Sequence, residues 1–269
     1  MSGSRRLTVL PFFVIAAAIG CGSGRPQDAS AKDDAGVAKP IQLAAATTDA
    51  GTSASQGSAT VNGSIKLTGT PPAPAPIKMD ADPQCALQHK DGAKSEDVVA
   101  NPNGTLRNVF VYVKDGLSGK TFPAPKDPVK LDQHGCQYSP HVLGMQVNQP
   151  IEIINDDSTL HNVNCKPTKS KGFNIAQPTA GMKSSKTFTA PEVMVKCACN
   201  VHPWMHMYIG VTDNPFYAVT GDDGSFSLKG LPAGQYTVEA WHEKYGTQTQ
   251  QVTVADGETK SVGFEFKAQ

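Results

Sequence analysis

The chain has 269 residues, and its 24 basic and 24 acidic side chains give a formal net charge of zero. It contains no basic stretch with interleaved aromatic residues, which argues against nucleic acid as a partner. Its length exceeds that of one small β-sandwich and predicts two domains.

The N-terminus has the features of a secretory signal. A basic pair, Arg5-Arg6, precedes an apolar run over residues 7–19 that is too short to span a bilayer. The run ends in Ala18-Ile19-Gly20-Cys21, which resembles the lipobox of bacterial lipoproteins. The resemblance implies a signal peptide over residues 1–20, acylation of Cys21 and attachment to a membrane through the lipid anchor. We therefore expect the chain in the cell envelope, facing the periplasm or the extracellular side; ordinary secretory cleavage nearby is the alternative.

Residues 21–58 are rich in Ala, Ser, Thr, Gly and Asp, with no aromatic residue and no periodic apolar pattern. Such a composition cannot bury a core, so we expect a disordered tether. A flexible chain of this length has a root-mean-square reach of about 30 Å. The tether would hold a folded domain away from the membrane.

From residue 59 onward, short β-branched and aromatic runs are broken by Gly, Pro, Asn and Asp, which is the all-β pattern. We expect no long helix there. The predicted strands lie at 59–67, 108–114, 129–131, 144–147, 151–155, 161–164, 186–189, 193–199 and 208–212. The proline-rich residues 71–76 predict a loop. The stretch 68–107 carries no functional motif.

The most informative motif is Cys199-Asn-Val-His202-Pro-Trp-Met205. Its thiolate, imidazole and thioether are three of the four ligands of a mononuclear blue-copper site, in which a Cys and two His form a plane and a Met binds weakly on the axis. The second imidazole has a candidate upstream in Leu160-His161-Asn162-Val163.

Together and in this order, the two motifs resemble the cupredoxins, of the amicyanin and plastocyanin type. The resemblance implies a Greek-key β-sandwich over residues 59–213. It also implies one type I copper ion that cycles between Cu(I) and Cu(II). Its implied ligands are His161, Cys199, His202 and Met205.

The same resemblance assigns roles around the copper. The backbone amide of Asn162 would donate to the sulfur of Cys199, and its side chain would tie the two ligand segments together. The ring edge of His202 would be the route by which electrons leave. Pro203 and Trp204 would form part of an apolar docking surface, although simple packing is an equal alternative for Trp204.

Other metal sites fit the spacing less well. A structural zinc site needs four strong ligands, and the thioether of Met205 is not one. A binuclear copper centre has three residues between its two cysteines, whereas Cys197-Ala-Cys199 has one. His206 and Met207 are rivals for the second imidazole and the axial thioether. Without a metal, the motif would be ordinary core packing.

The number of cysteines suggests disulfides. If Cys21 is acylated and Cys199 holds copper, an even number is left, which in an exported chain fits two disulfides with three connectivities. The remaining cysteines are Cys85, Cys136, Cys165 and Cys197. The alternative is a second metal site that combines Cys85-x-x-x-His89 with Cys136-x-x-x-x-His141.

The ligand assignment narrows the pairing. Because the first His and the Cys ligand must contact one metal, their strands must be close. Residues two apart on a strand share a face. If the two strands are antiparallel, Cys165 and Cys197 lie on the same side of the metal and can pair. Cys85 and Cys136 then remain for each other.

The C-terminal part contains a second motif. Val219-Thr-Gly-Asp-Asp-Gly-Ser-Phe-Ser-Leu228, followed by Gly230-Leu-Pro-Ala-Gly-Gln-Tyr-Thr-Val238, resembles the carboxypeptidase regulatory-like domain. Its Asp-Gly and Pro-Ala-Gly segments are typical of turns between strands. The resemblance implies a smaller transthyretin- or immunoglobulin-like β-sandwich over residues 214–269, without catalysis. We expect His242 to be structural.

These patterns predict an exported electron carrier that transfers single electrons between redox partners such as a c-type cytochrome or a dehydrogenase. One alternative is a copper chaperone or scavenger that binds Cu(I). Another is a metal-free adhesion or carbohydrate-binding protein. We do not expect an enzyme, because the sequence has no second His-rich motif for a further copper cluster.

Overall fold

The computed structural model describes residues 56–268. The predicted signal peptide at 1–20, the acylation of Cys21 and most of the tether at 21–58 lie outside the described residues. Within the described range, no helix is long and apolar enough to cross a bilayer.

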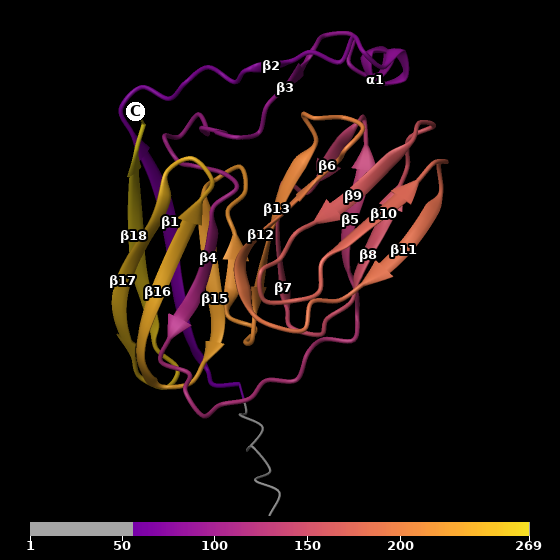
Figure 1. The fold of residues 1–269 in the computed structure, drawn as a ribbon. Helices are drawn as coiled ribbons and strands as arrows, with labels where there is room; N and C mark the ends of the chain where they lie inside the picture. Colours follow the sequence, from indigo (N-terminus) through magenta and orange to yellow (C-terminus); the bar gives the residue numbers. More distant parts are fainter. Residues whose placement is uncertain (1–55, 269) are drawn as a thin grey trace, which may run out of the picture. The chain divides into compact units, whose positions relative to one another are not determined.

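The described chain forms two β-sandwiches, which we call central and terminal (Figure 1). In the central sandwich, one sheet has the order β10-β9-β12-β13-β7 and the other β11-β8-β5-β6. The first sheet comprises β7 (Val142–Gln146), β9 (His161–Cys165), β10 (Phe173–Gln177), β12 (Glu192–Ala198) and β13 (His206–Thr212). The second comprises β5 (Val129–His134), β6 (Gln137–Ser139), β8 (Ile151–Asn155) and β11 (Met182–Lys186).

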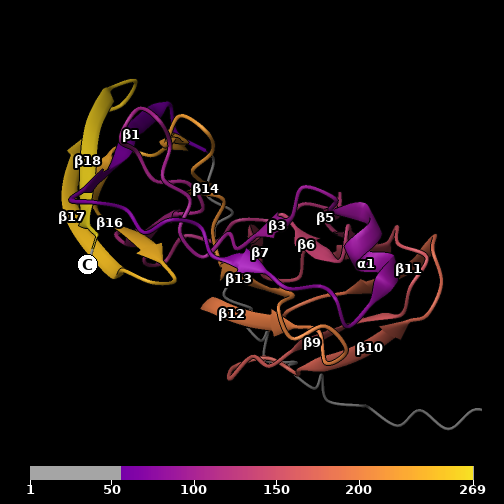
Figure 2. The ribbon, with the colours of Figure 1, turned by 90° about the horizontal axis from the view of Figure 1, so that it is seen from above.

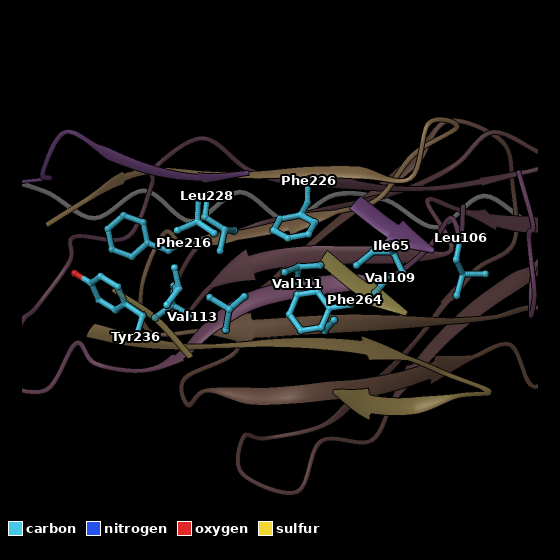
Figure 3. Packing of buried hydrophobic residues seen from close by; sticks show 14 of the residues in the cluster. Ile65, Leu106, Val109, Val111, Val113, Phe216, Phe226, Leu228, Tyr236 and Phe264 are labelled. Atoms are coloured by element: carbon cyan, nitrogen blue, oxygen red, sulfur yellow. The ribbon is translucent and has the colours of Figure 1, made fainter. Parts of the chain in front are cut away.

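The terminal sandwich has a sheet of order β15-β1-β18 and a sheet of order β14-β4-β16-β17. Its strands are β1 (Ala59–Thr68), β4 (Phe110–Asp115), β14 (Tyr217–Val219), β15 (Ser225–Leu231), β16 (Gly234–His242), β17 (Gly246–Val254) and β18 (Thr259–Lys267). Figure 3 shows its core, where Val111, Phe226 and Phe264 belong to one buried cluster. The predicted all-β class with two sandwiches is confirmed.

The sheet pairing divides the chain differently from the expected boundary at residues 213 and 214. β1 pairs with β15 antiparallel and with β18 parallel, so that Ile65 lies opposite Phe264. β4 pairs with β14 and β16. Both early strands therefore belong to the terminal sandwich, not to the domain expected at 59–213. Their alternating apolar residues fit either sandwich, so the local pattern could not assign them.

The two sandwiches approach closely at a pair of glycines. Gly144 of β7 lies opposite Gly210 of β13 in the central sandwich. A Cβ atom at Gly210 would lie 2.4 Å from the ring of Phe110, and one at Gly144 would lie 2.5 Å from the ring of Tyr217. Side chains at these two positions would therefore clash with aromatic rings of the terminal sandwich.

Residues 76–95 form a segment that we call the cap. It contains β2 (Pro76–Ile77), the helix α1 (Pro83–Gln88) and β3 (Ala93–Lys94). The Asp82 side chain accepts a hydrogen bond from the backbone of Gln84, and Pro83 occupies the first turn, which together start α1. Figures 1 and 2 show the cap beside one end of the central sandwich.

The strand predictions fail mainly at sheet edges. The strand expected at 186–189 overlaps β11 only at Lys186, where β11 ends, and β10 was not predicted. Both are edge strands, and every residue of β11 is at least partly exposed. An edge strand of this kind needs few apolar residues, so its pattern is weak.

Candidate metal centre

The candidate ligands lie at neighbouring ends of two paired strands. β9 begins with His161, and Cys199 follows the end of β12. The two strands are antiparallel, with Cys165 opposite Cys197. The loop after β12 closes on itself, because the Cys199 amide donates to the Met205 carbonyl (3.0 Å) and the Met205 amide donates to the His202 carbonyl (2.9 Å).

Three predicted ligands converge. The Nδ1 atoms of His161 and His202 are 2.9 Å apart, and Cys199 Sγ is 3.9 Å from His202 Nδ1. One ligand atom from each of the three residues lies within 4.8 Å of the others. The three residues are 0%, 2% and 4% exposed for His161, His202 and Cys199. A soft thiolate and two imidazoles in a buried pocket fit copper.

Met205 and its rival Met207 occupy different backbone settings. Met205 belongs to the ligand loop, whereas Met207 lies within β13 opposite Cys197. Both side chains are buried in the same cluster as Cys199. His206, the rival for the second imidazole, points its Nε2 atom toward Asp97 instead (3.3 Å).

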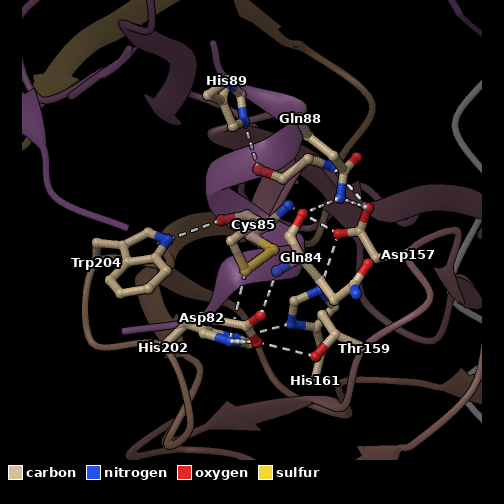
Figure 4. Close-up of a disulfide and its surroundings, with 12 residues drawn as sticks. Asp82, Gln84, Cys85, Gln88, His89, Asp157, Thr159, His161, His202 and Trp204 are labelled. Carbon is tan, nitrogen blue, oxygen red and sulfur yellow. Dashed lines mark hydrogen bonds and ion pairs between the residues drawn. A yellow bond between two sulfur atoms is a disulfide. The ribbon is translucent and has the colours of Figure 1, made fainter. Parts of the chain in front are cut away.

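Each imidazole is held at its other nitrogen by a carboxylate. His161 Nε2 lies 2.8 Å from Asp157 Oδ2, and His202 Nε2 lies 3.0 Å from Asp82 Oδ2 (Figure 4). An ionised carboxylate only accepts hydrogen bonds, so both Nε2 atoms must be donors. In neutral rings, both Nδ1 atoms then carry lone pairs, which face each other at 2.9 Å. That arrangement requires a cation, either a proton or a metal ion, between them.

The electrostatics of the pocket favour the carboxylate form of Asp157, the thiolate form of Cys199 and the protonated form of His161. Burial opposes ionisation of Asp157, but hydrogen bonds from His161 and the Cys136 amide lower its pKa to about 2. Burial opposes the thiolate of Cys199, but hydrogen bonds from His161 and from nearby backbone groups lower its pKa to about 6. Burial would lower the pKa of His161, but Asp157 and Cys199 raise it to about 9.

Asn162 joins the two ligand segments through its side chain. Its Oδ1 atom accepts hydrogen bonds from the Asn200 amide (2.7 Å) and from the Cys199 thiol (3.4 Å). The His202 amide also donates to Cys199 Sγ (3.4 Å). Asn162 therefore fixes the start of the ligand loop relative to β9.

His202, the predicted exit for electrons, is covered by the cap. The residue is 2% exposed, because Asp82 and Cys85 lie over it, with Cys85 Sγ 3.6 Å from His202 Nε2. Trp204 is half-buried, and its Nε1 donates to the Cys136 carbonyl (2.9 Å). The ring edge of His202 therefore does not face solvent directly.

Sequence reasoning missed both carboxylates. Asp157 precedes His161 by four residues in the same turn-rich segment, so its proximity was a detectable signal. Asp82 lies 120 residues from His202 and carries only the signature of a helix N-cap before proline. Residues 68–107, which had no functional interpretation, thus supply part of the wall of this site.

The disulfide prediction is confirmed. Cys85 is bonded to Cys136 and Cys165 to Cys197, and among the described cysteines Cys199 is free. The alternative metal site at Cys85 and Cys136 is wrong, because neither sulfur is available as a thiolate.

The C-terminal part of the chain matches a known family. Residues 208–267 match the family model of the carboxypeptidase regulatory-like domain. The match begins within β13 of the central sandwich and does not include β1 or β4. The predicted resemblance of the C-terminal part to this family is confirmed. A search of curated proteins with the sequence finds no match.

Solved structures resemble part of the chain. A copper-containing nitrite reductase from Thermus scotoductus shares 23% identity over 33% of this chain and 23% of that chain, with a TM-score of 0.30. A purple cupredoxin from Nitrosopumilus maritimus shares 23% identity over 31% and 99%, with a TM-score of 0.28. An oxidised amicyanin variant shares 22% identity over 31% and 81%, with a TM-score of 0.28. The chain thus spans about a quarter of the reductase, and these likenesses carry no conclusion about activity.

Proposed function

We propose that this chain is a mononuclear type I copper protein that carries single electrons. The observation that carries the proposal is the convergence of His161 Nδ1, His202 Nδ1 and Cys199 Sγ in a buried pocket. Because both Nε2 atoms are engaged by carboxylates, the Nδ1 atoms, which lie on the side of the thiol, are the nitrogens free to bind a metal.

Copper bound there supplies reversible one-electron chemistry. His161, Cys199 and His202 would hold it, and the thioether of Met205 would be an additional weak donor. Asp82 and Asp157 orient the imidazoles and make them more basic, as carboxylates behind metal-bound His commonly do. The hydrogen bonds of Asp82, Asp157 and Asn162 would hold the ligand positions similar in both oxidation states.

The proposal includes the partners and the location. Redox proteins such as a c-type cytochrome or a dehydrogenase would exchange electrons with the chain, which a lipid on Cys21 would hold at the cell envelope. In residues 56–268, the large hydrophobic side chains that are exposed are Leu87, Leu160 and Val201. Leu87 lies on the cap, and Leu160 and Val201 directly precede His161 and His202. This arrangement suits docking of a partner near the site.

A redox titration of the copper-loaded full-length chain tests this proposal. We expect one copper per chain, with a thiolate-to-copper absorption band that bleaches with one electron and returns on reoxidation. A Cu(I) chaperone or scavenger would bind the metal without a reversible band. Tight Cu(I) binding with no band after oxidation would therefore refute the electron carrier and favour the chaperone.

A further inference from the structure

A second cluster of metal-binding groups lies outside the proposed copper site. Asp97, His141, His206 and Glu243 each place a ligand atom within 4.8 Å of the others. They come from the chain after β3, from just before β7, from β13 and from just after β16. His141 and Glu243 are nearly fully buried, with side chains that are 5% and 4% exposed. This combination was not predicted from the sequence, because its members are far apart along the chain, although His141 and His206 each appeared in other candidate sites.

The hydrogen bonds within the cluster leave one nitrogen poorly matched. His206 Nδ1 lies 3.3 Å from the Trp204 carbonyl, which can only accept, so Nδ1 is the donor. In a neutral ring, His206 Nε2 then carries a lone pair. That atom faces two carboxylate oxygens, Asp97 Oδ1 at 3.3 Å and Glu243 Oε2 at 3.6 Å. Three electron-rich atoms facing one another require a cation between them, either a proton on His206 Nε2 or a metal ion.

The neighbouring lysine does not satisfy the cluster. Lys244 Nζ contacts Asp97 Oδ2 at 2.7 Å and is 4.0 Å from Glu243 Oε2. The other oxygen of Asp97, Oδ1, is buried and makes no hydrogen bond. Glu243 Oε1 pairs with His141 Nε2 on the opposite side of the cluster. The lysine therefore contacts mainly the outer oxygen of Asp97, and His206 Nε2 is the group that faces Asp97 Oδ1 and Glu243 Oε2.

We propose that Asp97, His141, His206 and Glu243 form a second metal site for a divalent transition ion of the Zn²⁺ class. Two imidazoles and two carboxylates are a nitrogen and oxygen donor set that suits Zn²⁺ and Cu²⁺. The set lacks a thiolate and is thus a poor site for Cu(I). This difference in ligand softness would let the two sites take different ions. His206 directly follows Met205, so the two sites are adjacent along the chain.

The site is accessible from solvent. A cavity of about 310 Å³ is lined by Asp97, His141 and His206, together with Trp204 and Met205. The side chains of Asp97 and His206 are 29% and 21% exposed, which gives an ion a path to the buried pair. The cavity also leaves room for water or a small anion as an additional ligand.

Titration of the metal-free full-length Cys199→Ser chain with Co²⁺ tests the inference. The substitution removes the thiolate of the first site, and the variants of the cluster residues show whether the bound Co²⁺ lies in the cluster or between the imidazoles of His161 and His202. We expect one Co²⁺ per chain, with visible d–d bands and displacement by Zn²⁺. Adding Glu243→Gln or His141→Ala should lower the affinity for Co²⁺ by at least about tenfold. Removing even a group that only supports a metal ligand commonly has an effect of this size.

His134→Ala is the matched control, because His134 is exposed on β5 and outside the cluster. It should leave the affinity for Co²⁺ unchanged. Thermal unfolding checks that each variant is folded. If a variant is not folded, Asp97→Asn is used in its place, because Asp97 is a more exposed ligand. Absence of a stoichiometric Co²⁺ ion, or equal affinities in the ligand variants and the control, would overturn the proposal.

Discussion

Asp82 and Asp157 hold the two imidazoles in the same way from distant parts of the chain. Each carboxylate accepts a hydrogen bond from Nε2 of its imidazole, so that Nδ1 of the same ring is directed toward Cys199. Asp157 is itself fixed by the amides of Gly135 and Cys136, at 2.9 and 2.7 Å. The ligand geometry is therefore supported by a second layer of buried hydrogen bonds.

We predict that Asp157→Asn raises the reduction potential of the copper-loaded chain. Removing the buried negative charge makes His161 a weaker donor and destabilises Cu(II) more than Cu(I). A shift of about 60 mV corresponds to about 1.4 kcal/mol for a one-electron couple. Potentiometric titration measures the change. Asp156→Asn, at the exposed neighbouring position, should leave the potential nearly unchanged, and a shift of similar size there would contradict the account.

The axial ligand gives a second prediction at this scale. Met205→Leu should keep the strong charge-transfer band, because the thiolate and both imidazoles remain. It should raise the potential, on the order of 60 mV for about 1.4 kcal/mol, since a weak donor to Cu(II) is lost. Met207→Leu should change neither observable, since Met207 lies within β13. The opposite behaviour of the two variants would make Met207 the axial ligand.

At the residue scale, the sequence predicted the donors better than their surroundings. Cys199, His202 and Met205 are close along the chain, so their spacing is informative. His161 was found through the motif around it. The contact of Asp82 with His202 and the burial of His202 could not be predicted. Both depend on where the cap folds, and Asp82 in the cap is 120 residues from His202 along the chain.

At the scale of elements, the cap decides access to the centre. It is attached to the central sandwich by the disulfide between Cys85 and Cys136, and Asp82 at the start of α1 bonds to His202. A short helix with six residues has little stability alone, so its position depends on these attachments.

We predict that the double variant Cys85→Ala/Cys136→Ala speeds electron exchange with a small oxidant several-fold. Loosening the cap would expose His202, which is the imidazole that the cap shields. Stopped-flow oxidation of the Cu(I) form measures the rate. Leu87→Ala, an exposed change on the same helix, is the control and should leave the rate unchanged. An unchanged rate in the double variant would show that electrons do not pass through the covered edge.

At the scale of the whole molecule, the two sandwiches are interleaved in sequence. β1 and β4 precede the central sandwich, whereas β14 to β18 follow it. Family motifs located the later strands, since turn residues and apolar alternation are local signals. It was not predictable that β1 and β4 belong to the terminal sandwich. Long-range strand pairing decides this, and a strand with alternating apolar residues fits either sandwich.

This interleaving predicts the effect of truncation. A chain that ends at residue 213 would lack every strand that pairs with β1 or β4 and most of the aromatic core of the terminal sandwich. Val61, Ile65 and Val111, which are fully buried, would become exposed. We expect the truncated chain to aggregate through these residues, although the strands of the central sandwich remain. A soluble product in which β1 and β4 stay protected from proteolysis would contradict the observed pairing.

The visible absorption spectrum of the full-length chain loaded with Cu(II) tests the central claim most directly. We predict an intense thiolate-to-copper band that disappears in Cys199→Ser and persists in His134→Ala, which changes an exposed residue outside the site. The band requires a copper–thiolate bond, and Cys199 is the free cysteine among the described residues. A colourless Cu(II) complex of the unmutated chain, or a band that survives Cys199→Ser, would contradict the copper centre proposed here.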